Sequence, residues 1–310
     1  MKKLACTLLL LSSALVQAGF DEGLVAVDKG DYQTAFKEWK PLAEQGDSYA
    51  QYNLGIMYDN GQGIAQNYTQ ALYWYNKAAA QGFAKAQYSL GVMYDNGKGV
   101  AQNYTQALYW YNKAAEQGHA KAQYNLAVMY ANGKGVAQNY TQALYWYNKA
   151  AEQGDASAQF NLGVMYSKGQ GVPQNYTQVL YWYNKAAAQG HAKAQYNLGV
   201  MYDKGHGVPQ NYNQAIYWYK KAAAQGDAYA QYNLGVMYST GRGIPQNYKI
   251  AYILFNLAAS NGDADATQNR EIAAAKLSPA TIEDAQRITM QLHNSKNFAA
   301  DLRKLLNSQK

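Results

Sequence analysis

The sequence repeats one fourteen-residue segment almost unchanged. QNYTQALYWYNKAA begins at Gln66, Gln102 and Gln138, and near copies begin at Gln174 and Gln210. The glycines that close each copy recur every 36 residues, at Gly46, Gly82, Gly118, Gly154, Gly190, Gly226 and Gly262. A fixed period of this length is typical of stacked supersecondary units, in which each unit contacts its neighbours along the chain. We therefore predict an all-α solenoid with six full units over residues 47–262.

Each unit is expected to hold two helices. In the first unit, one helix spans Ser48 to about Asp59 and is broken by the Asn60–Gly63 loop, because glycine enters positive-φ turns freely. The second begins at Asn67, a good N-cap, and stops before Gly82. At 100° per residue one face of this second helix gathers the side chains that we expect in the core: Ala71, Trp74, Tyr75, Ala78 and Ala79.

Aromatic residues are unusually frequent, with 31 tyrosines in the chain, and one set of them falls on the polar face of the second helices. Two interpretations of this set stay open. The rings could pack on lysine stems and neighbouring repeats, or they could form a rigid strip that stacks on sugars or docks a partner. The set is Tyr73, Tyr109, Tyr145, Tyr181 and Tyr217. The tryptophans beside them are expected in the core.

The ends of the chain differ from the repeats. Residues 1–18 have the basic, apolar and small-residue parts of a signal peptide, which predicts cleavage near Ala18 and a periplasmic or secreted protein. The alternative is a buried N-terminal helix. The single cysteine, Cys6, lies in this segment, so the mature chain would have no disulfide. No later apolar run is long enough for a transmembrane segment. Residues 19–46 and 263–310 are expected to form capping helices, the last of them, residues 298–306, folding back or contacting a partner or membrane surface.

The sequence offers little for catalysis. It predicts no cofactor, no metal site and no catalytic residue, because four scattered histidines form no ligand cluster and no Ser–His or paired-carboxylate pattern occurs. An acid pair assembled from different repeats stays open. The formal charge of +7 comes from scattered basic residues, which argues against nucleic-acid binding.

The repeated pattern AQYNLGVMYDNGKGV…NY..AL.WY.KAA.QG resembles the Sel1-like repeat, a relative of the tetratricopeptide repeat, over residues 47–262. The segment DYQTAFKEWKPLAEQGD, which begins at Asp31, resembles the entry segment of bacterial members. The resemblance implies an α/α superhelical solenoid that binds other proteins. It also implies links to envelope maintenance, cell-wall enzymes or host proteins for exported members. A cysteine-rich branch with proposed penicillin-binding or β-lactamase activity differs from this chain, whose mature part has no cysteine.

In tetratricopeptide-like folds the first helix of each pair lines a concave groove, and this implies a set of partner-binding residues. The implied residues are Tyr52, Tyr88, Tyr124, Phe160, Tyr196, Tyr232, Asp59, Asp95, Asp203, Asn60, Asn96 and Asn132. The alternative is that these side chains pack against the second helix of a neighbouring repeat. The resulting hypothesis is an exported scaffold that binds an envelope enzyme or a host protein. The alternatives are a peptidoglycan- or glycan-binding envelope protein and a cell-wall-active or β-lactam-modifying enzyme. The oligomeric state stays open.

Overall fold

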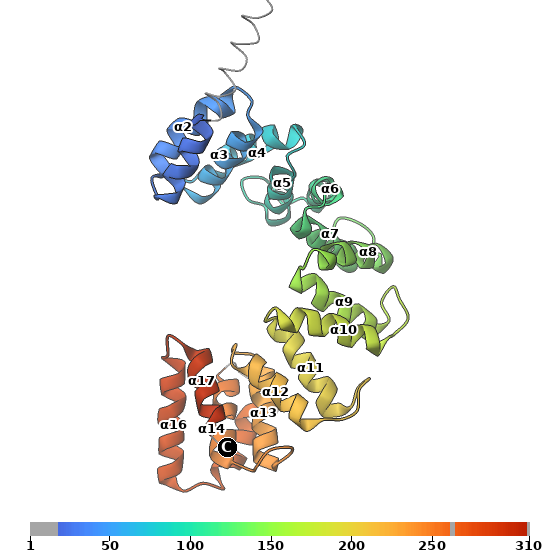
Figure 1. The fold of residues 1–310 in the computed structure, drawn as a ribbon, viewed down its shortest axis with the longest axis vertical. Coiled ribbons are helices and arrows are strands. Elements are labelled where there is room, and N and C mark those ends of the chain that lie inside the picture. The colour runs from blue at the N-terminus through green and yellow to red at the C-terminus, as the bar shows by residue number, and fades with distance from the viewer. Residues whose placement is uncertain (1–17, 261–263, 309–310) are drawn as a thin grey trace, which may run out of the picture. The chain divides into compact units, whose positions relative to one another are not determined.

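The computed structural model describes residues 18–260 and 264–308, which form helices joined by short loops (Figure 1). Within these residues no strand occurs. The helices fall into two compact units, one ending at Gln153 and the other beginning at Gly154. The predicted signal peptide lies outside the described residues, except for Ala18. Among the described residues, no helix combines the length and the apolar character needed to cross a membrane.

The unit that ends at Gln153 contains a helix over residues 18–28 followed by α2 and three helix pairs. Its helices are α2 Tyr32–Glu44, α3 Ser48–Asn60, α4 Tyr68–Ala80, α5 Ala84–Asn96, α6 Tyr104–Glu116, α7 Ala120–Asn132 and α8 Tyr140–Glu152. Neighbouring helices pack in chain order, α3 on α4, α4 on α5, and so on to α8. This arrangement is the predicted stack of helix pairs.

The unit that begins at Gly154 contains three further pairs and three additional helices. Its helices are α9 Ala156–Lys168, α10 Tyr176–Ala188, α11 Ala192–Lys204, α12 Tyr212–Ala223, α13 Ala228–Thr240, α14 Tyr248–Ala259, α15 Ala264–Ala274, α16 Pro279–His293 and α17 Phe298–Asn307. Ser278 caps α16 and Pro279 stands at its start, where a proline fits a helix.

Local chemistry explains why each pair breaks at the same place. Asn67 is the N-cap of α4, and its side chain accepts a hydrogen bond from the backbone N–H of Gln70. Gly61 ends α3 in the left-handed region at φ 69°. Gly63, at φ 72°, lies so close to Tyr32 that a Cβ would approach the Tyr32 backbone within 2.7 Å. The loop therefore needs glycine at both positions.

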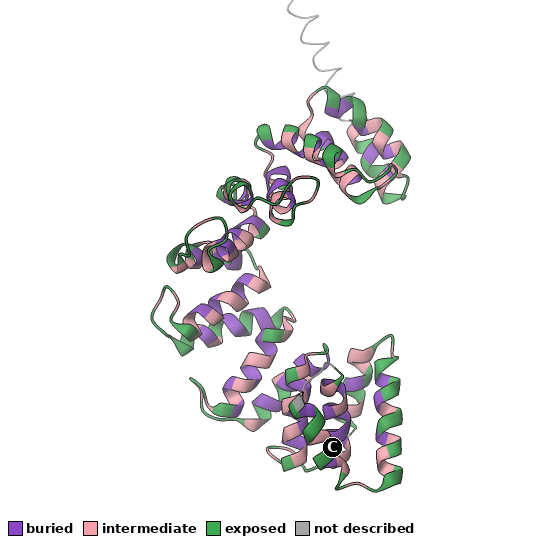
Figure 2. Ribbon diagram, turned by 180° about the vertical axis from the view of Figure 1, so that it is seen from behind, coloured by how far each residue is buried: buried purple, intermediate pink, exposed green. Residues whose placement is uncertain are grey.

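Within each compact unit the core runs between the helices of each pair and between neighbouring pairs (Figure 2). In α4 the buried residues are the five that the helical period predicts, with alanines at closest approach. The tryptophans join neighbouring elements: Trp74 lies in one cluster with Trp39 of α2 and Leu54 of α3, and Trp110 packs against the cluster around Tyr75 of the preceding pair. Trp74 and Trp182 are buried, whereas the structure leaves Trp110, Trp146 and Trp218 partly exposed at the edge of the stack.

A ladder of hydrogen-bonded glutamines joins the repeats. Gln123 Nε2 donates to the Ala115 carbonyl at 3.1 Å, and its Oε1 accepts from Gln153 Nε2 at 2.7 Å. Equivalent bonds involve the buried first-helix glutamines Gln51, Gln87, Gln195 and the exposed second-helix glutamines Gln81, Gln117, Gln225. Each first-helix glutamine thus satisfies a carbonyl at the end of the preceding helix.

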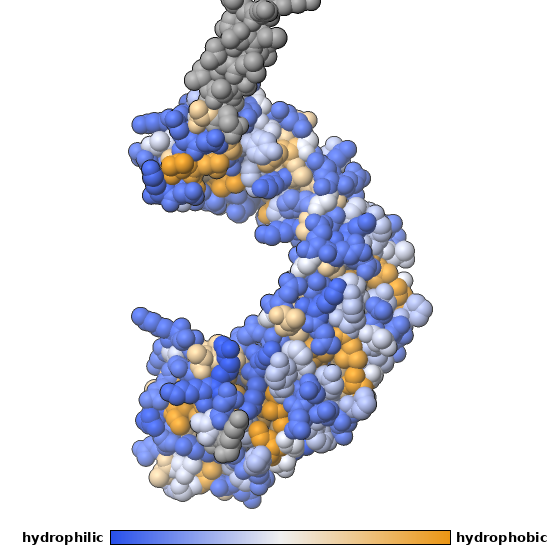
Figure 3. Space-filling model, in the orientation of Figure 1, coloured by the Kyte–Doolittle hydropathy of each residue, from blue (hydrophilic) through white to orange (hydrophobic). Residues whose placement is uncertain are grey.

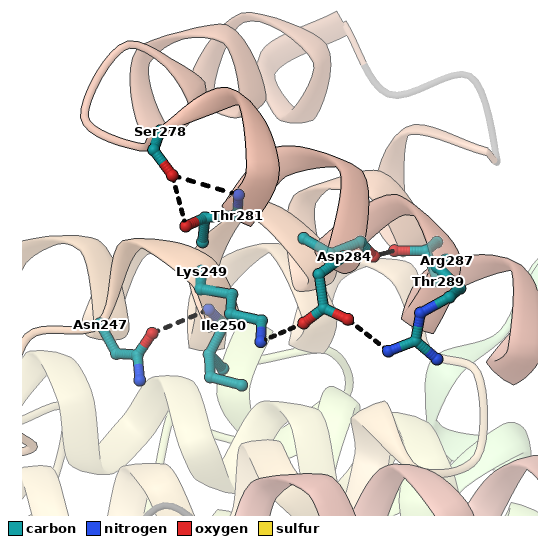
Figure 4. Close-up of polar contacts among 9 residues, drawn as sticks. Asn247, Lys249, Ile250, Ser278, Thr281, Asp284, Arg287 and Thr289 are labelled. Carbon is teal, nitrogen blue, oxygen red and sulfur yellow. Dashed lines mark hydrogen bonds and ion pairs between the residues drawn. The ribbon is translucent and has the colours of Figure 1, made fainter.

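The C-terminal helices pack back onto the last pairs. Asp284 of α16 bonds to Lys249 of α14 and to Arg287 of its own helix (Figure 4). These two cations, Lys249 foremost, hold the pKa of the Asp284 carboxyl below its usual range. Leu302 and Leu306 of α17 are buried in the cluster that also contains Tyr219 of α12.

Candidate partner-binding faces

The first-helix ladder is the set of six aromatic residues that the sequence assigns to partner binding: Tyr52, Tyr88, Tyr124, Phe160, Tyr196 and Tyr232. All six are partly exposed. Each ring packs on an aromatic ring of the second helix in its own pair, as Tyr52 does on Tyr75 with centroids 5.8 Å apart. The other five pairs have centroids 5.6–6.1 Å apart. One side of each ladder ring is therefore held by its own repeat.

Several ladder rings are also held by the residue that precedes the next first helix. His119 stacks on Tyr88 and His191 stacks on Phe160, each with centroids 4.7 Å apart, and Phe83 lies 5.1 Å from Tyr52. Burial accordingly raises the pKa of the Tyr52 hydroxyl. The sequence left open that these rings pack against the second helix of a neighbouring repeat. They pack instead on the second helix of their own pair, and in several repeats on the residue before the next first helix, and they stay partly exposed.

The predicted aspartates mainly join repeats. Asp59 pairs with Lys98 of the next repeat at 3.3 Å, and Asp203 pairs with Arg242 at 3.5 Å. Asp203 is buried, which leaves little of it for a partner. Asp95 accepts a hydrogen bond from the Tyr111 hydroxyl at 3.4 Å.

The predicted asparagines lie beside these contacts at the exposed C-terminal ends of the first helices. Asn60, Asn96 and Asn132 are all exposed. Asn96 Nδ2 donates to the Val92 carbonyl of its own helix at 3.0 Å. Their amides are accessible at the end of the ladder face, whereas the ladder rings lie about two turns earlier in each helix.

The outer ladder is the second set of tyrosines, on the polar face of the second helices: Tyr73, Tyr109, Tyr145, Tyr181 and Tyr217. These side chains are 48–51% exposed, as predicted. Each ring meets the following tryptophan edge-on, at 4.8–4.9 Å between centroids. The lysine one turn later lies over each ring at 4.6–5.8 Å. The predicted packing on lysine is therefore present, and it covers one face of each ring.

Other chemistry is sparse over the described part of the chain. Within residues 18–260 and 264–308, no group of three or more His, Cys, Asp or Glu side chains is placed to hold a metal ion. On the face drawn in Figure 3, hydrophobic residues appear as separate patches among hydrophilic ones. The two ladders are thus the extended features that repeat along the chain.

Comparison with known proteins agrees with this geometry. The Sel1 repeat model matches six consecutive segments, residues 48–83, 84–119, 120–155, 156–191, 192–227 and 228–263. A Sel1 repeat protein from Oxalobacter formigenes is similar in structure, with TM-score 0.70 and 36% identity. That match covers 77% of this chain and 96% of the other chain. No curated protein matches the sequence.

A second solved structure, c5321, is described as a protective antigen present in uropathogenic Escherichia coli strains and displaying an SLR fold. It is similar with TM-score 0.63 and 29% identity over 95% of this chain and 79% of its own. The helix pairs, the shared period and the six matched segments lead to one conclusion. The chain belongs to the Sel1 repeat family.

Proposed function

We propose that this chain is an exported scaffold that binds a protein partner along the face formed by the first-helix ladder. The observation that carries the proposal is the half-buried state of the six ladder rings, each of which packs on its own repeat and stays partly exposed. Sel1 repeats form a scaffold fold that typically mediates protein–protein interaction, and such proteins are generally non-catalytic.

Pre-positioned rings suit this role energetically. A tyrosine already fixed by its neighbours loses little conformational freedom when a partner covers its exposed part, so more of the contact energy appears as affinity. Within each compact unit the rings recur once per repeat, so each unit presents equivalent contacts at repeating intervals. An extended or repetitive segment of an envelope enzyme or a host protein is the partner that fits such intervals.

Export is the other part of the proposal. It is supported by Lys2 and Lys3, the apolar run after them and the small residue Ala18, which together have the order of a signal peptide. Removal near Ala18 would leave a mature chain that begins at Gly19, in the periplasm or outside the cell.

Peptidoglycan binding is the second candidate, and the observation that favours it is the half-exposed outer ladder. Sugar rings stack on open aromatic faces. The lysine over each outer tyrosine covers one such face, at 4.6 Å for Lys185 over Tyr181. This cover makes the outer ladder the weaker candidate, and purified sacculi provide the direct test.

The experiment compares the mature chain with two variants in a crosslinked pull-down from envelope extract and from host-cell extract. One variant carries Tyr124→Ala and Tyr196→Ala in the first-helix ladder, and the control carries Tyr73→Ala and Tyr181→Ala in the outer ladder. We expect a protein captured by the wild type and by the control to be lost from the first-helix variant. The captured protein is then purified, and its dissociation constant is measured for each form.

Folding is controlled separately, because Tyr124 and Tyr196 are half-buried. A Tyr124→Phe and Tyr196→Phe variant keeps the packing, as Phe160 does at the same position, and should keep the binding. The proposal fails if the first-helix alanine variant binds the purified partner as tightly as the wild type. If the chain binds purified sacculi and only the outer-ladder variant loses this binding, the peptidoglycan function replaces the proposed one.

A further inference from the structure

The second helices form a hollow that is separate from the first-helix ladder. The α8 hollow, of about 440 Å³, is lined by residues of α6, α7 and α8 and of the turns after α6 and α8. Tyr145, Trp146 and Lys149 form one wall, and Glu116 and Glu152 also line it. Gln123, which also lines the hollow, is held by the glutamine ladder.

An equivalent hollow two repeats later is partly filled by the chain itself. The α12 hollow, of about 280 Å³, shares seven lining positions with the α8 hollow, among them Gln195 for Gln123 and Lys221 for Lys149. Its other two lining residues are Ala299 and Arg303 of α17. These residues are one helical turn apart, and the Arg303 Nε donates to the Ala299 carbonyl at 2.8 Å. Helix α17 thus shows which kind of segment fits this site.

The two hollows differ in charge at two shared positions. Glu116 and Glu152 of the α8 hollow correspond to Ala188 and Ala224 of the α12 hollow. Where α17 lies, Arg303 meets no carboxylate among the lining residues of the α12 hollow. In the α8 hollow the same guanidinium would meet two carboxylates beside an aromatic wall, and both features attract arginine.

A lysine in the hollow does not exclude an arginine. Lys149 lies over the Tyr145 ring at 5.8 Å, and Lys221 lies over the Tyr217 ring at 4.6 Å in the α12 hollow. The α12 hollow contains both Lys221 and Arg303, so a lysine held over the tyrosine leaves room for an arginine.

We propose that the α8 hollow is a second binding site, for a helix of a partner protein that presents a small residue and an arginine one turn apart. The small residue allows the helix to approach the hollow closely, as Ala299 does at the α12 hollow. The arginine enters between Glu116 and Glu152 against Tyr145 and Trp146.

The test uses a labelled peptide with the sequence of residues 297–308, which contains Ala299 and Arg303. A short peptide is poorly helical in water, so a lactam joins Asn297→Lys to Asp301 on the side of the helix away from Ala299 and Arg303. Fluorescence anisotropy measures its dissociation constant for the mature chain and for a Glu116→Ala, Glu152→Ala variant. Both alanines occur naturally at the equivalent positions 188 and 224, which makes the variant a conservative one for folding.

We expect the double variant to bind roughly three- to tenfold more weakly, the loss expected from two exposed charge pairs. The Arg303→Ala peptide should lose a similar factor, and the wild-type affinity should fall as salt rises. Equal binding of the wild-type peptide to both proteins would overturn the proposal. A second result would also overturn the proposal: the wild-type chain dimerises as its concentration rises, and the double variant does not. The occupant of the hollow would then be a second copy of the chain.

Discussion

One position of the repeat, at the start of each first helix, is occupied by three kinds of side chain. The residue before each first helix is Asp47, Phe83, His119, Asp155, His191 or Asp227. The aspartates accept the backbone N–H three residues later through Oδ1, as Asp155 does from Ala158 at 2.8 Å, while both histidines accept it through Nδ1. Phe83 makes no cap bond and instead packs against Tyr49 and Tyr52. The position therefore needs either a hydrogen-bond acceptor or an aromatic ring.

The histidine caps should make stability depend on pH. Burial, followed by Lys121 for His119 and Lys193 for His191, lowers both imidazole pKa values below the ordinary value near 6.5. As pH falls through that ordinary value, the unfolded chain binds protons before the folded chain does, so the free energy of unfolding decreases. We expect it to decrease between pH 7.5 and 5.5 in urea titrations of the wild type.

The matched variant carries His119→Asp and His191→Asp, which copies the caps of the other repeats. Its free energy of unfolding should change less over the same pH interval, because the carboxylates of these aspartates stay ionised there. An unchanged pH slope in the variant would show that the two histidines do not cause the dependence.

At the scale of the helix, the glutamine ladder is the feature that the sequence does not reveal. The helical period predicts Ala50, Leu54, Met57 and Tyr58 on one face of the first helix. The first three are buried, whereas Tyr58 is partly exposed. Gln51 is also buried, because its amide bonds the Ala43 carbonyl at 3.0 Å. A polar residue is ordinarily assigned to the surface, and only the arrangement of two repeats reveals its partners.

Gln123→Ala should therefore destabilise the chain by about 1–3 kcal/mol, because it leaves the buried Ala115 carbonyl and the Gln153 amide without their partner. The control is Gln138→Ala, where an exposed glutamine donates to the Ala131 carbonyl at 2.7 Å and water can replace it. The control should change stability by at most about 0.5 kcal/mol. Chemical denaturation measures both, and equal effects would contradict the structural role of the ladder.

At the scale of the whole chain, the fold follows from the sequence almost completely, because one repeated pattern fixes helix starts, helix ends and buried faces together. The candidate faces follow less well. The outer ladder depends on the period of one helix, which the sequence shows directly. Asp203 pairs with Arg242, which lies 39 positions later in the neighbouring repeat. A prediction made from the pattern of one repeat does not include this pair, and it therefore assigns Asp203 to the groove. The α12 hollow needs α17, which lies outside the repeats.

A stack in which each pair contacts mainly its neighbours should respond locally to damage at one end. Removing residues 295–310 deletes Leu302 and Leu306 from the cluster that holds α12, α14 and α16 together. Each buried leucine contributes about 1.5–3 kcal/mol, so α12, α14 and α16 should lose hydrogen-exchange protection. The helices α3, α4, α5 and α6 belong to the other compact unit and should keep theirs. Lys304→Ala, which changes an exposed residue of the same helix, serves as the control and should leave the pattern unchanged. Equal loss of protection in α3–α6 would show that the chain unfolds as a single cooperative body and that its repeats are coupled well beyond their neighbours.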